Sequence, residues 1–137
     1  MKVGIIGSGN GGTTLAYDIS SKGYEVRITD LPRFLDNVRA IKKTGGIFAK
    51  VKGLQEEKFA AVSASESIEN VMKYADLIFV SAPAYGTKPI ASACKPYITE
   101  KHKIILCPGT IGGALEFKKE IGFNSENRVT PMVGIYF

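Results

Sequence analysis

Histidine and cysteine, two residues that often bind metals or take part in catalysis, are scarce in this sequence of 137 residues, which has one histidine and two cysteines. Cys94 and Cys107 lack the close spacing of a zinc-binding pair, so we expect reduced, buried thiols and no metal site. The histidine, His102, stands in a polar segment between Glu100 and Lys103. This setting predicts a position on the surface and argues against a catalytic role.

Long apolar segments are also missing. No apolar run approaches the roughly 20 residues that are needed to cross a bilayer. The N-terminus has the pattern of a strand and not that of a signal peptide. We therefore expect a cytoplasmic protein that does not bind membranes, and the length fits a single domain, residues 1–137.

The basic residues of the chain do not form one strong cluster. The formal net charge is +5, yet the basic residues are scattered or stand beside acids, and the densest group is Lys50, Lys52 and Lys58. This group lacks interleaved aromatic residues and matches no nucleic-acid-binding motif, so it indicates a solvated face in preference to a nucleic-acid site. A mild positive field also suits an anionic ligand.

The first 30 residues contain the pattern around which the chain is organised. Residues 2–6 predict a buried strand, residues 7–12 are rich in glycine, and residues 13–22 place apolar side chains on one helical face. A second strand-like run, residues 24–29, leads to Asp30, roughly 20 residues beyond the glycine segment. This order is typical of a dinucleotide-binding fold, and a glycine-rich turn without a ligand is the alternative.

Each glycine of the Gly-x-Gly-x-x-Gly pattern has its own expected role. Gly7 allows the tight reversal from strand to helix, Gly9 lets a pyrophosphate approach the backbone, and Gly12 lets the helix pack closely on the strand. Unpaired N–H groups of the first helical turn would bind the phosphates, aided by the helix dipole. The residues expected around the pyrophosphate are Gly7, Ser8, Gly9, Asn10, Gly11 and Gly12.

The end of the second strand predicts which dinucleotide binds. Asp30 can accept hydrogen bonds from both ribose hydroxyls and would repel a 2′-phosphate, so we expect NAD(H) in preference to NADP(H). Arg33 lies where its guanidinium could stack on adenine, although an ordinary exposed helix charge explains it equally well. An arginine at this position could also neutralise a 2′-phosphate, which keeps NADP(H) as the less favoured alternative.

The rest of the chain predicts a doubly wound, mainly parallel α/β sheet of the Rossmann type, with helices on both faces. Ala82 and Pro83 follow an apolar strand and are expected to form a wall of the cofactor site. Pro108 and Gly109 open a second glycine-rich strand exit near the nicotinamide, where a plain tight turn is nearly as good an explanation. The expected helices cover residues 32–44, 63 or 65 to 74, 90–98 and 114–121. The expected strands cover residues 76–81 and 103–107, and a last strand starts at residue 128. A hairpin-like pair is expected at 47–51 and 59–62.

The C-terminal residues Ile135, Tyr136 and Phe137 are unusually apolar for the end of a chain. We expect a further domain to cover them in a longer protein. We also expect the isolated chain to self-associate, with a homodimer as the form.

Three segments together resemble the N-terminal cofactor domain of the opine dehydrogenases, the octopine, nopaline and N-(carboxyethyl)norvaline dehydrogenase group. They are residues 3–12, residues 75–84 and residues 108–117, whose Gly-Gly-Ala-Leu-Glu-Phe run is the most specific. The resemblance implies an NAD(P)-dependent dehydrogenase that condenses an amino acid with a 2-oxo acid by hydride transfer. The family's catalytic histidine–aspartate pair belongs to a second, helical domain, so the resemblance assigns no catalytic residue here and implies that this chain alone is inactive.

Two departures from the family concern the nicotinamide side. Cys107 stands where relatives have asparagine, and Gly86 and Thr87 replace histidines that some relatives carry. These departures affect the expected substrate and not cofactor binding. Two other interpretations stay open: glycerol-3-phosphate dehydrogenases and ketopantoate reductases share the first half of this architecture, and a stand-alone nucleotide-binding module would perform no chemistry.

Overall fold

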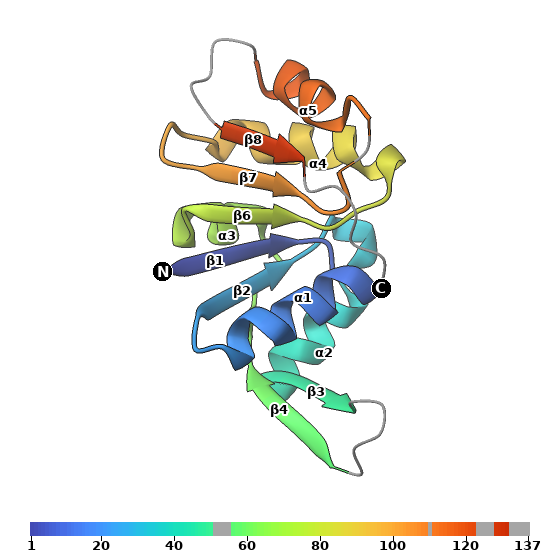
Figure 1. The fold of residues 1–137 in the computed structure, drawn as a ribbon, viewed down its shortest axis with the longest axis vertical. Helices are drawn as coiled ribbons and strands as arrows, with labels where there is room; N and C mark the ends of the chain where they lie inside the picture. The colour runs from blue at the N-terminus through green and yellow to red at the C-terminus, as the bar shows by residue number, and fades with distance from the viewer. Residues whose placement is uncertain (51–55, 110, 123–127, 132–137) are drawn as a thin grey trace.

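The structure, a computed structural model, describes residues 1–50, 56–109, 111–122 and 128–131. Its main sheet contains parallel strands in the order β5-β2-β1-β6-β7-β8 (Figure 1). The strands are β1 (Lys2–Ile6), β2 (Glu25–Thr29), β5 (Ser63–Ala64), β6 (Leu77–Val80), β7 (Lys103–Leu106) and β8 (Arg128–Pro131). This order, which runs outward in both directions from β1, confirms the predicted doubly wound α/β fold.

Strand β1 lies inside the sheet, and its alternating side chains face two separate cores. Val3 and Ile5 join one apolar cluster, whereas Ile6 joins the other. Gly4 belongs to the second face, where an added Cβ would lie 2.8 Å from Val71 Cγ1. The burial of both faces explains why this strand is a continuous apolar run in the sequence.

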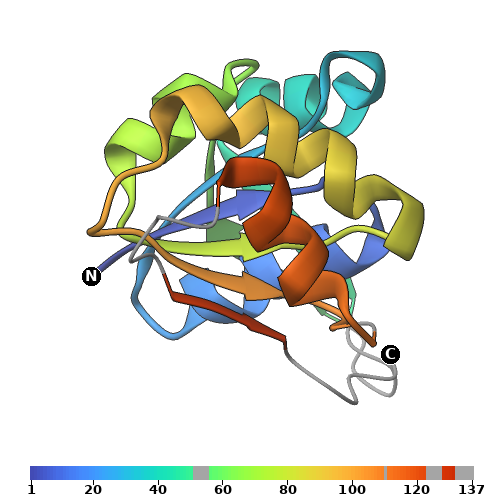
Figure 2. The same ribbon diagram turned by 90° about the horizontal axis from the view of Figure 1, so that it is seen from above.

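Helices cover both faces of the sheet. They are α1 (Asn10–Ser21), α2 (Asp36–Thr44), α3 (Ile68–Tyr74), α4 (Thr87–Cys94) and α5 (Gly113–Ile121). Helices α1 and α2 contribute Ala16 and Ile41 to the core of one face, while α3, α4 and α5 supply side chains such as Met72, Ile90 and Phe117 to the other. Figure 2 shows α1 (blue) and α4 (gold) on opposite sides of the sheet. This layering matches the architecture that the sequence predicts.

A hairpin forms a separate antiparallel pair at the lower end of the molecule in Figure 1. Its strands are β3 (Gly46–Lys50) and β4 (Glu57–Ala61), in which Phe48 pairs with Phe59. The two rings have centroids 4.9 Å apart at an interplanar angle of 51°. The hairpin-like pair at 47–51 and 59–62 is therefore confirmed in its described part, and Val51 lies outside the described residues.

Several element boundaries differ from the sequence prediction. The expected helix 32–44 is a short 3₁₀ turn, η1 (Pro32–Phe34), followed by α2. Helix α3 starts only at Ile68, because Ser63–Ala64 extend the sheet as β5 and pair with β2. Helix α4 ends at Cys94 and continues as the 3₁₀ turn η3 (Lys95–Tyr97), and the segment between β6 and α4 contains a third such turn, η2 (Ala84–Gly86).

The expected surface position of His102 was wrong. Its side chain is 1% exposed and lies between α3 and the segment that precedes β7. Both ring nitrogens have hydrogen-bond partners, which explains how a polar ring is accommodated in the interior. The exposed neighbours Lys101 and Lys103 gave the segment its polar character.

The two cysteines are buried free thiols, as predicted. Cys94 belongs to the core beneath α4, where burial raises the pKa of its thiol to about 12. Burial also raises the pKa of the Cys107 thiol, at the end of β7. Both side chains act as small apolar core residues.

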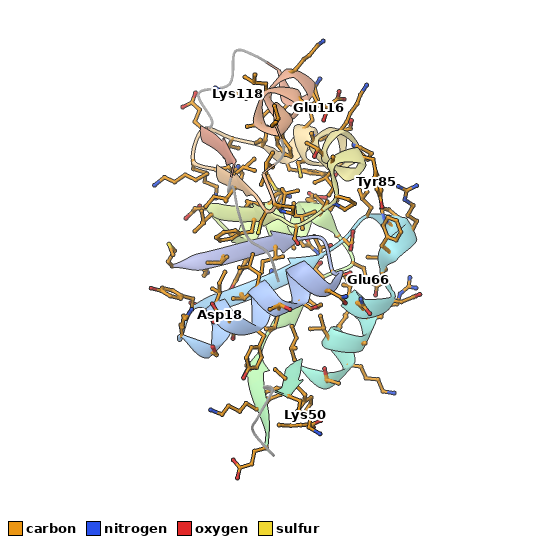
Figure 3. The ribbon with its side chains drawn as sticks, turned by 45° about the vertical axis from the view of Figure 1, so that its right-hand side comes forward. Asp18, Lys50, Glu66, Tyr85, Glu116 and Lys118 are labelled. Carbon is orange, nitrogen blue, oxygen red and sulfur yellow. The ribbon has the colours of Figure 1, made fainter. Side chains whose placement is uncertain are left out.

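Charged side chains are spread over separate elements and not gathered on one face. Figure 3 shows charged residues on α1, β3, the segment before α3, and α5: Asp18, Lys50, Glu66, Glu116 and Lys118. Acids and bases pair locally, as in the 2.9 Å contact between Arg39 Nε and Glu66 Oε2. Within the described ranges, no helix has the length and apolar character that a membrane span requires.

Candidate functional site

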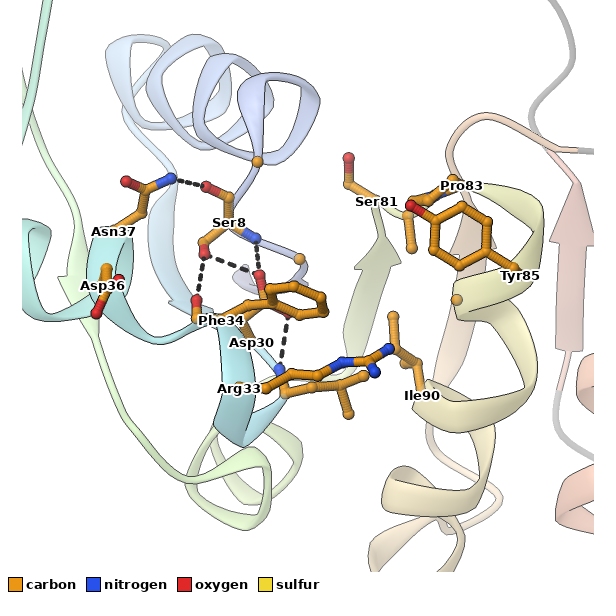
Figure 4. A pocket seen from close by; sticks show the side chains of 15 residues that line it. Ser8, Asp30, Arg33, Phe34, Asp36, Asn37, Ser81, Pro83, Tyr85 and Ile90 are labelled. Atoms are coloured by element: carbon orange, nitrogen blue, oxygen red, sulfur yellow. Dashed lines mark hydrogen bonds between the residues drawn. The ribbon is translucent and has the colours of Figure 1, made fainter.

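A cavity of about 440 Å³ opens at the carboxyl edge of the sheet, beside the ends of β1, β2 and β6 (Figure 4). In doubly wound folds this edge is the ligand-binding edge, at the point where the strand order reverses. The structure brings together most of the site residues that the sequence predicted. The predicted residues that line the cavity are Gly7, Ser8, Gly9, Asp30, Arg33, Ala82 and Pro83.

The glycine turn between β1 and α1 contains two glycines that the fold itself requires. Gly7 has a φ of +113°, and an added Cβ would lie 2.0 Å from the Ser81 carbonyl oxygen. At Gly12, an added Cβ would lie 1.8 Å from the Gly7 carbonyl oxygen. Any side chain at either position would collide with backbone, so these glycines allow β1, α1 and β6 to pack closely.

Gly9 differs from these two glycines. Its φ of −70° is accessible to any residue, and an added Cβ would meet no atom within 4 Å. The fold therefore gives no reason for glycine at this position. Gly9 lines the cavity, so an added side chain would occupy space at a ligand-binding edge.

The N-terminus of α1 begins directly after Gly9, which is its N-cap residue. The N-cap makes no side-chain hydrogen bond to the helix, and the first turn contains no acidic side chain. The backbone N–H groups of a first helical turn have no partner within the helix and carry the positive end of its dipole. This end of α1 is therefore suited to an anion such as a phosphate.

Asp30 follows β2 and is 7% exposed. Its Oδ2 accepts hydrogen bonds from the backbone N–H of Ser8 at 2.6 Å and from the Ser8 hydroxyl at 2.8 Å. Its Oδ1 accepts a bond of 2.7 Å from the backbone N–H of Leu31. These bonds fix the carboxylate against the glycine turn, and a carboxylate has about four acceptor positions, so capacity remains for a ligand hydroxyl.

The outer walls of the cavity are partly aromatic. Arg33 and Phe34 lie on η1, with the guanidinium carbon of Arg33 4.8 Å from the centroid of the Phe34 ring. Tyr85, on η2, is 78% exposed and lies across the cavity from them (Figure 4). A flat guanidinium and two aromatic rings provide surfaces on which a planar ring system can stack.

Some predicted site residues lie outside the cavity wall. Asn10 borders a shallower neighbouring groove beside the hairpin, while Gly11 and Gly12 lie in the first turn of α1. Pro108 and Gly109 follow β7 at the same edge of the sheet but do not line this cavity. Their assignment to the nicotinamide side stays a prediction.

The sequence prediction missed several lining residues. They are Leu31, Phe34, Asp36, Asn37, Ser81, Tyr85, Gly86 and Ile90. The residues that follow Asp30 and Pro83 in the sequence could have been found by including a few more positions after the end of each predicted strand. Asn37 had no such signal, because its role depends on a hydrogen bond to Ser8, 29 residues away in the chain.

A parallel sheet of this order, a glycine turn that leads into a helix, and an acid after the second strand define a Rossmann-type domain. Residues 3–135 match the family described as ketopantoate reductase PanE/ApbA, and the chain belongs to this family.

Known proteins similar to this chain include dehydrogenases of the predicted kinds. The chain is 35% identical over 126 residues to an opine dehydrogenase of Arthrobacter sp. (strain 1C), covering 92% of this chain and 34% of that protein. It is 30% identical over 83 residues to a glycerol-3-phosphate dehydrogenase [NAD(P)+] of Acholeplasma laidlawii (strain PG-8A), covering 61% of this chain and 23% of that protein. The resemblance to opine dehydrogenases is thereby confirmed.

The fold similarity extends to a solved structure of octopine dehydrogenase in complex with NADH and agmatine. The TM-score is 0.74 at 25% sequence identity, and the match covers 89% of this chain and 32% of that one. The chain thus spans about a third of the length of its opine dehydrogenase relatives.

Proposed function

We propose that this chain binds a nicotinamide dinucleotide, NAD(H) in preference to NADP(H), at the glycine turn between β1 and α1. The observation that carries the proposal is Gly9, a cavity-lining glycine that the fold does not require. A ligand that must approach the backbone closely gives a physical reason for a missing side chain there. The uncapped N-terminus of α1 supplies the positive end of a helix dipole beside it.

The residues of the cavity fit the parts of a dinucleotide. The Gly7–Gly12 turn would hold the pyrophosphate, and Asp30 would accept from the adenosine ribose. Arg33, Phe34 and Tyr85 offer stacking surfaces for adenine, and Ala82 and Pro83 form a wall beside it. Pro108 and Gly109 would lie toward the nicotinamide half. The bound cofactor supplies hydride chemistry, and these residues bind and orient it.

The wider function we infer is that of an opine-dehydrogenase-like oxidoreductase, in which an amino acid is reductively condensed with a 2-oxo acid. The 35% identity to an opine dehydrogenase and the Gly-Gly-Ala-Leu-Glu-Phe run at residues 112–117 support this substrate class. Reduction of a 2-oxo acid of the ketopantoate type is the second candidate, which the family match favours. Because the chain spans about a third of its opine dehydrogenase relatives, it represents the cofactor-binding part of such an enzyme, residues 1–137.

Two further proposals concern the setting of the protein. Two buried free thiols suit the reducing cytoplasm. The homodimer proposed from the sequence depends on residues 135–137, which lie outside the described residues. Sedimentation velocity over a range of concentrations tests it, and a monomer at high concentration contradicts it.

Isothermal titration calorimetry with NADH tests cofactor binding directly. Gly9→Val should abolish binding because the valine side chain enters the space beside the pyrophosphate. Valine is also a poorer N-cap residue than glycine, so this variant should lose about 1 kcal/mol of stability. Thr14→Val serves as the control, since Thr14 is exposed one turn further along α1 and should bind NADH as the wild type does. A wild-type protein that binds neither NADH nor NADPH at millimolar concentrations would contradict the proposal.

A further inference from the structure

Ser8 has both of its backbone polar groups tied to side chains from the segment after β2. Its N–H donates to Asp30 Oδ2 at 2.6 Å, and its carbonyl oxygen accepts a bond of 2.7 Å from Asn37 Nδ2. The Ser8 hydroxyl lies 2.8 Å from Asp30 Oδ2 and 3.2 Å from the Phe34 carbonyl oxygen. The glycine turn is therefore held by four contacts from residues 30–37.

The bond from Asn37 has a geometric consequence for Gly9. The Ser8 carbonyl and the Gly9 N–H belong to the same planar trans peptide, so they point in opposite directions. Because Asn37 holds the carbonyl toward α2, the Gly9 N–H must point away from α2. In Figure 4, Asn37 and Ser81 lie on opposite sides of Ser8, and Ser81 belongs to the far wall of the cavity.

Asn37 is well placed to impose this direction. Asn37 is the second residue of α2. The following residue, Val38, is fully buried, so the core holds this end of the helix in place. The helix itself receives no side-chain cap. The Asn37 amide therefore acts on the glycine turn and not on its own helix terminus. The side chain is otherwise exposed, so the core does not depend on it.

We propose that Asn37 is a positioning residue for the dinucleotide, which orients the Ser8–Gly9 peptide so that the Gly9 N–H faces the pyrophosphate. The inference rests on the proposed function. It assigns to α2 a role in phosphate binding through a hydrogen bond to the turn. A preorganised N–H donor saves the ligand the cost of turning the peptide on binding.

The test compares two ligands, ADP-ribose, which contains the pyrophosphate, and adenosine, which does not. Asn37→Ala should weaken ADP-ribose binding roughly three- to tenfold, the range of one hydrogen bond, and leave adenosine binding unchanged. Asn37→Asp keeps the size of the side chain but replaces the donor by a carboxylate oxygen, so it should weaken ADP-ribose binding at least as much. Calorimetry measures the affinity for ADP-ribose, and ligand-observed NMR measures the affinity for adenosine.

Asn70→Ala is the matched control. Asn70 is also an exposed helical asparagine whose amide donates a hydrogen bond, in this case to Ser65 Oγ at 3.3 Å on the segment before α3. This variant should bind both ligands as the wild type does.

Three outcomes overturn the proposal in distinguishable ways. Wild-type affinity for ADP-ribose in both Asn37 variants would remove the positioning role and leave the proposed function standing. An equal loss for adenosine and ADP-ribose together with a lowered melting temperature would show a merely structural role. A wild-type protein that binds no ADP-ribose would remove the proposed function itself.

Discussion

His102 Nε2 lies 2.8 Å from the backbone carbonyl oxygen of Met72, in the last turn of α3. A carbonyl oxygen only accepts, so Nε2 carries the proton, and Nδ1 is free to accept from the Thr99 backbone N–H at 2.9 Å. The ring thus satisfies a carbonyl that the end of a helix leaves without a helical partner. It joins α3 to the segment that precedes β7.

Replacing this ring should destabilise the fold without affecting the cofactor site. His102→Ala removes a buried hydrogen bond to Met72 and a partly buried one from Thr99, and it leaves a cavity, so the free energy of unfolding should fall by about 2–4 kcal/mol in urea titration. Lys101→Ala, at an exposed neighbouring position, should change it by less than about 0.5 kcal/mol. NADH affinity of the folded variant should be unchanged, because His102 precedes β7 at the amino edge of the sheet. A stability equal to that of the wild type would contradict the structural role.

Asp30 should determine the choice between the two nicotinamide dinucleotides. The wild type should bind NADH more tightly than NADPH in calorimetry, since a 2′-phosphate would approach a carboxylate fixed by Ser8 and Leu31. Asp30→Asn should reduce the preference for NADH over NADPH, because it removes the negative charge of the carboxylate. It should also lower stability by about 1–3 kcal/mol, because the amide cannot accept from both backbone donors through two oxygens. A tighter wild-type affinity for NADPH would instead indicate that Arg33 binds the 2′-phosphate.

The Cys94 thiol should be inert in the native protein. Its pKa of about 12 leaves about one molecule in 10⁴ as thiolate at pH 8, and the side chain is fully buried. A Cys107→Ala variant isolates this thiol. It should release no colour from a disulfide reagent such as Ellman's at pH 8 until guanidinium unfolds it. Rapid native reaction would show that the region around α4 opens readily.

The chain by itself should bind cofactor without turning it over. Among the described residues that line the cavity, those with ionisable side chains are Asp30, Arg33, Asp36 and Tyr85, and His102 precedes β7 at the opposite edge of the sheet. The proposed function places none of these side chains beside the nicotinamide, where a general acid must lie within hydrogen-bond reach of the imine or ketone. Mixtures of amino acids and 2-oxo acids should therefore leave the absorbance of NADH constant. Oxidation that depends on both substrates would show that these residues suffice for catalysis.

The sequence predicted the parts of the fold that depend on local patterns. The apolar run before Gly7 and the acid at Asp30 located β1 and β2 and the cavity between them, because strand length and glycine spacing are local properties. His102 was placed wrongly because its exposed neighbours say nothing about a ring that turns inward. Asn37 could not be identified, since its partner Ser8 is brought near only by the path of the chain through β2.

The interior position of β1 has a consequence for the order of events during synthesis. Val3 pairs with Val26 on one side and with Leu77 on the other, so β1, which is synthesised before β6, has one edge uncovered until β6 has been made. Until then, an apolar strand keeps one row of backbone donors and acceptors open to other chains. Parallel pairings of such long sequence separation form slowly, so nascent chains halted before β6 are the ones most exposed to aggregation.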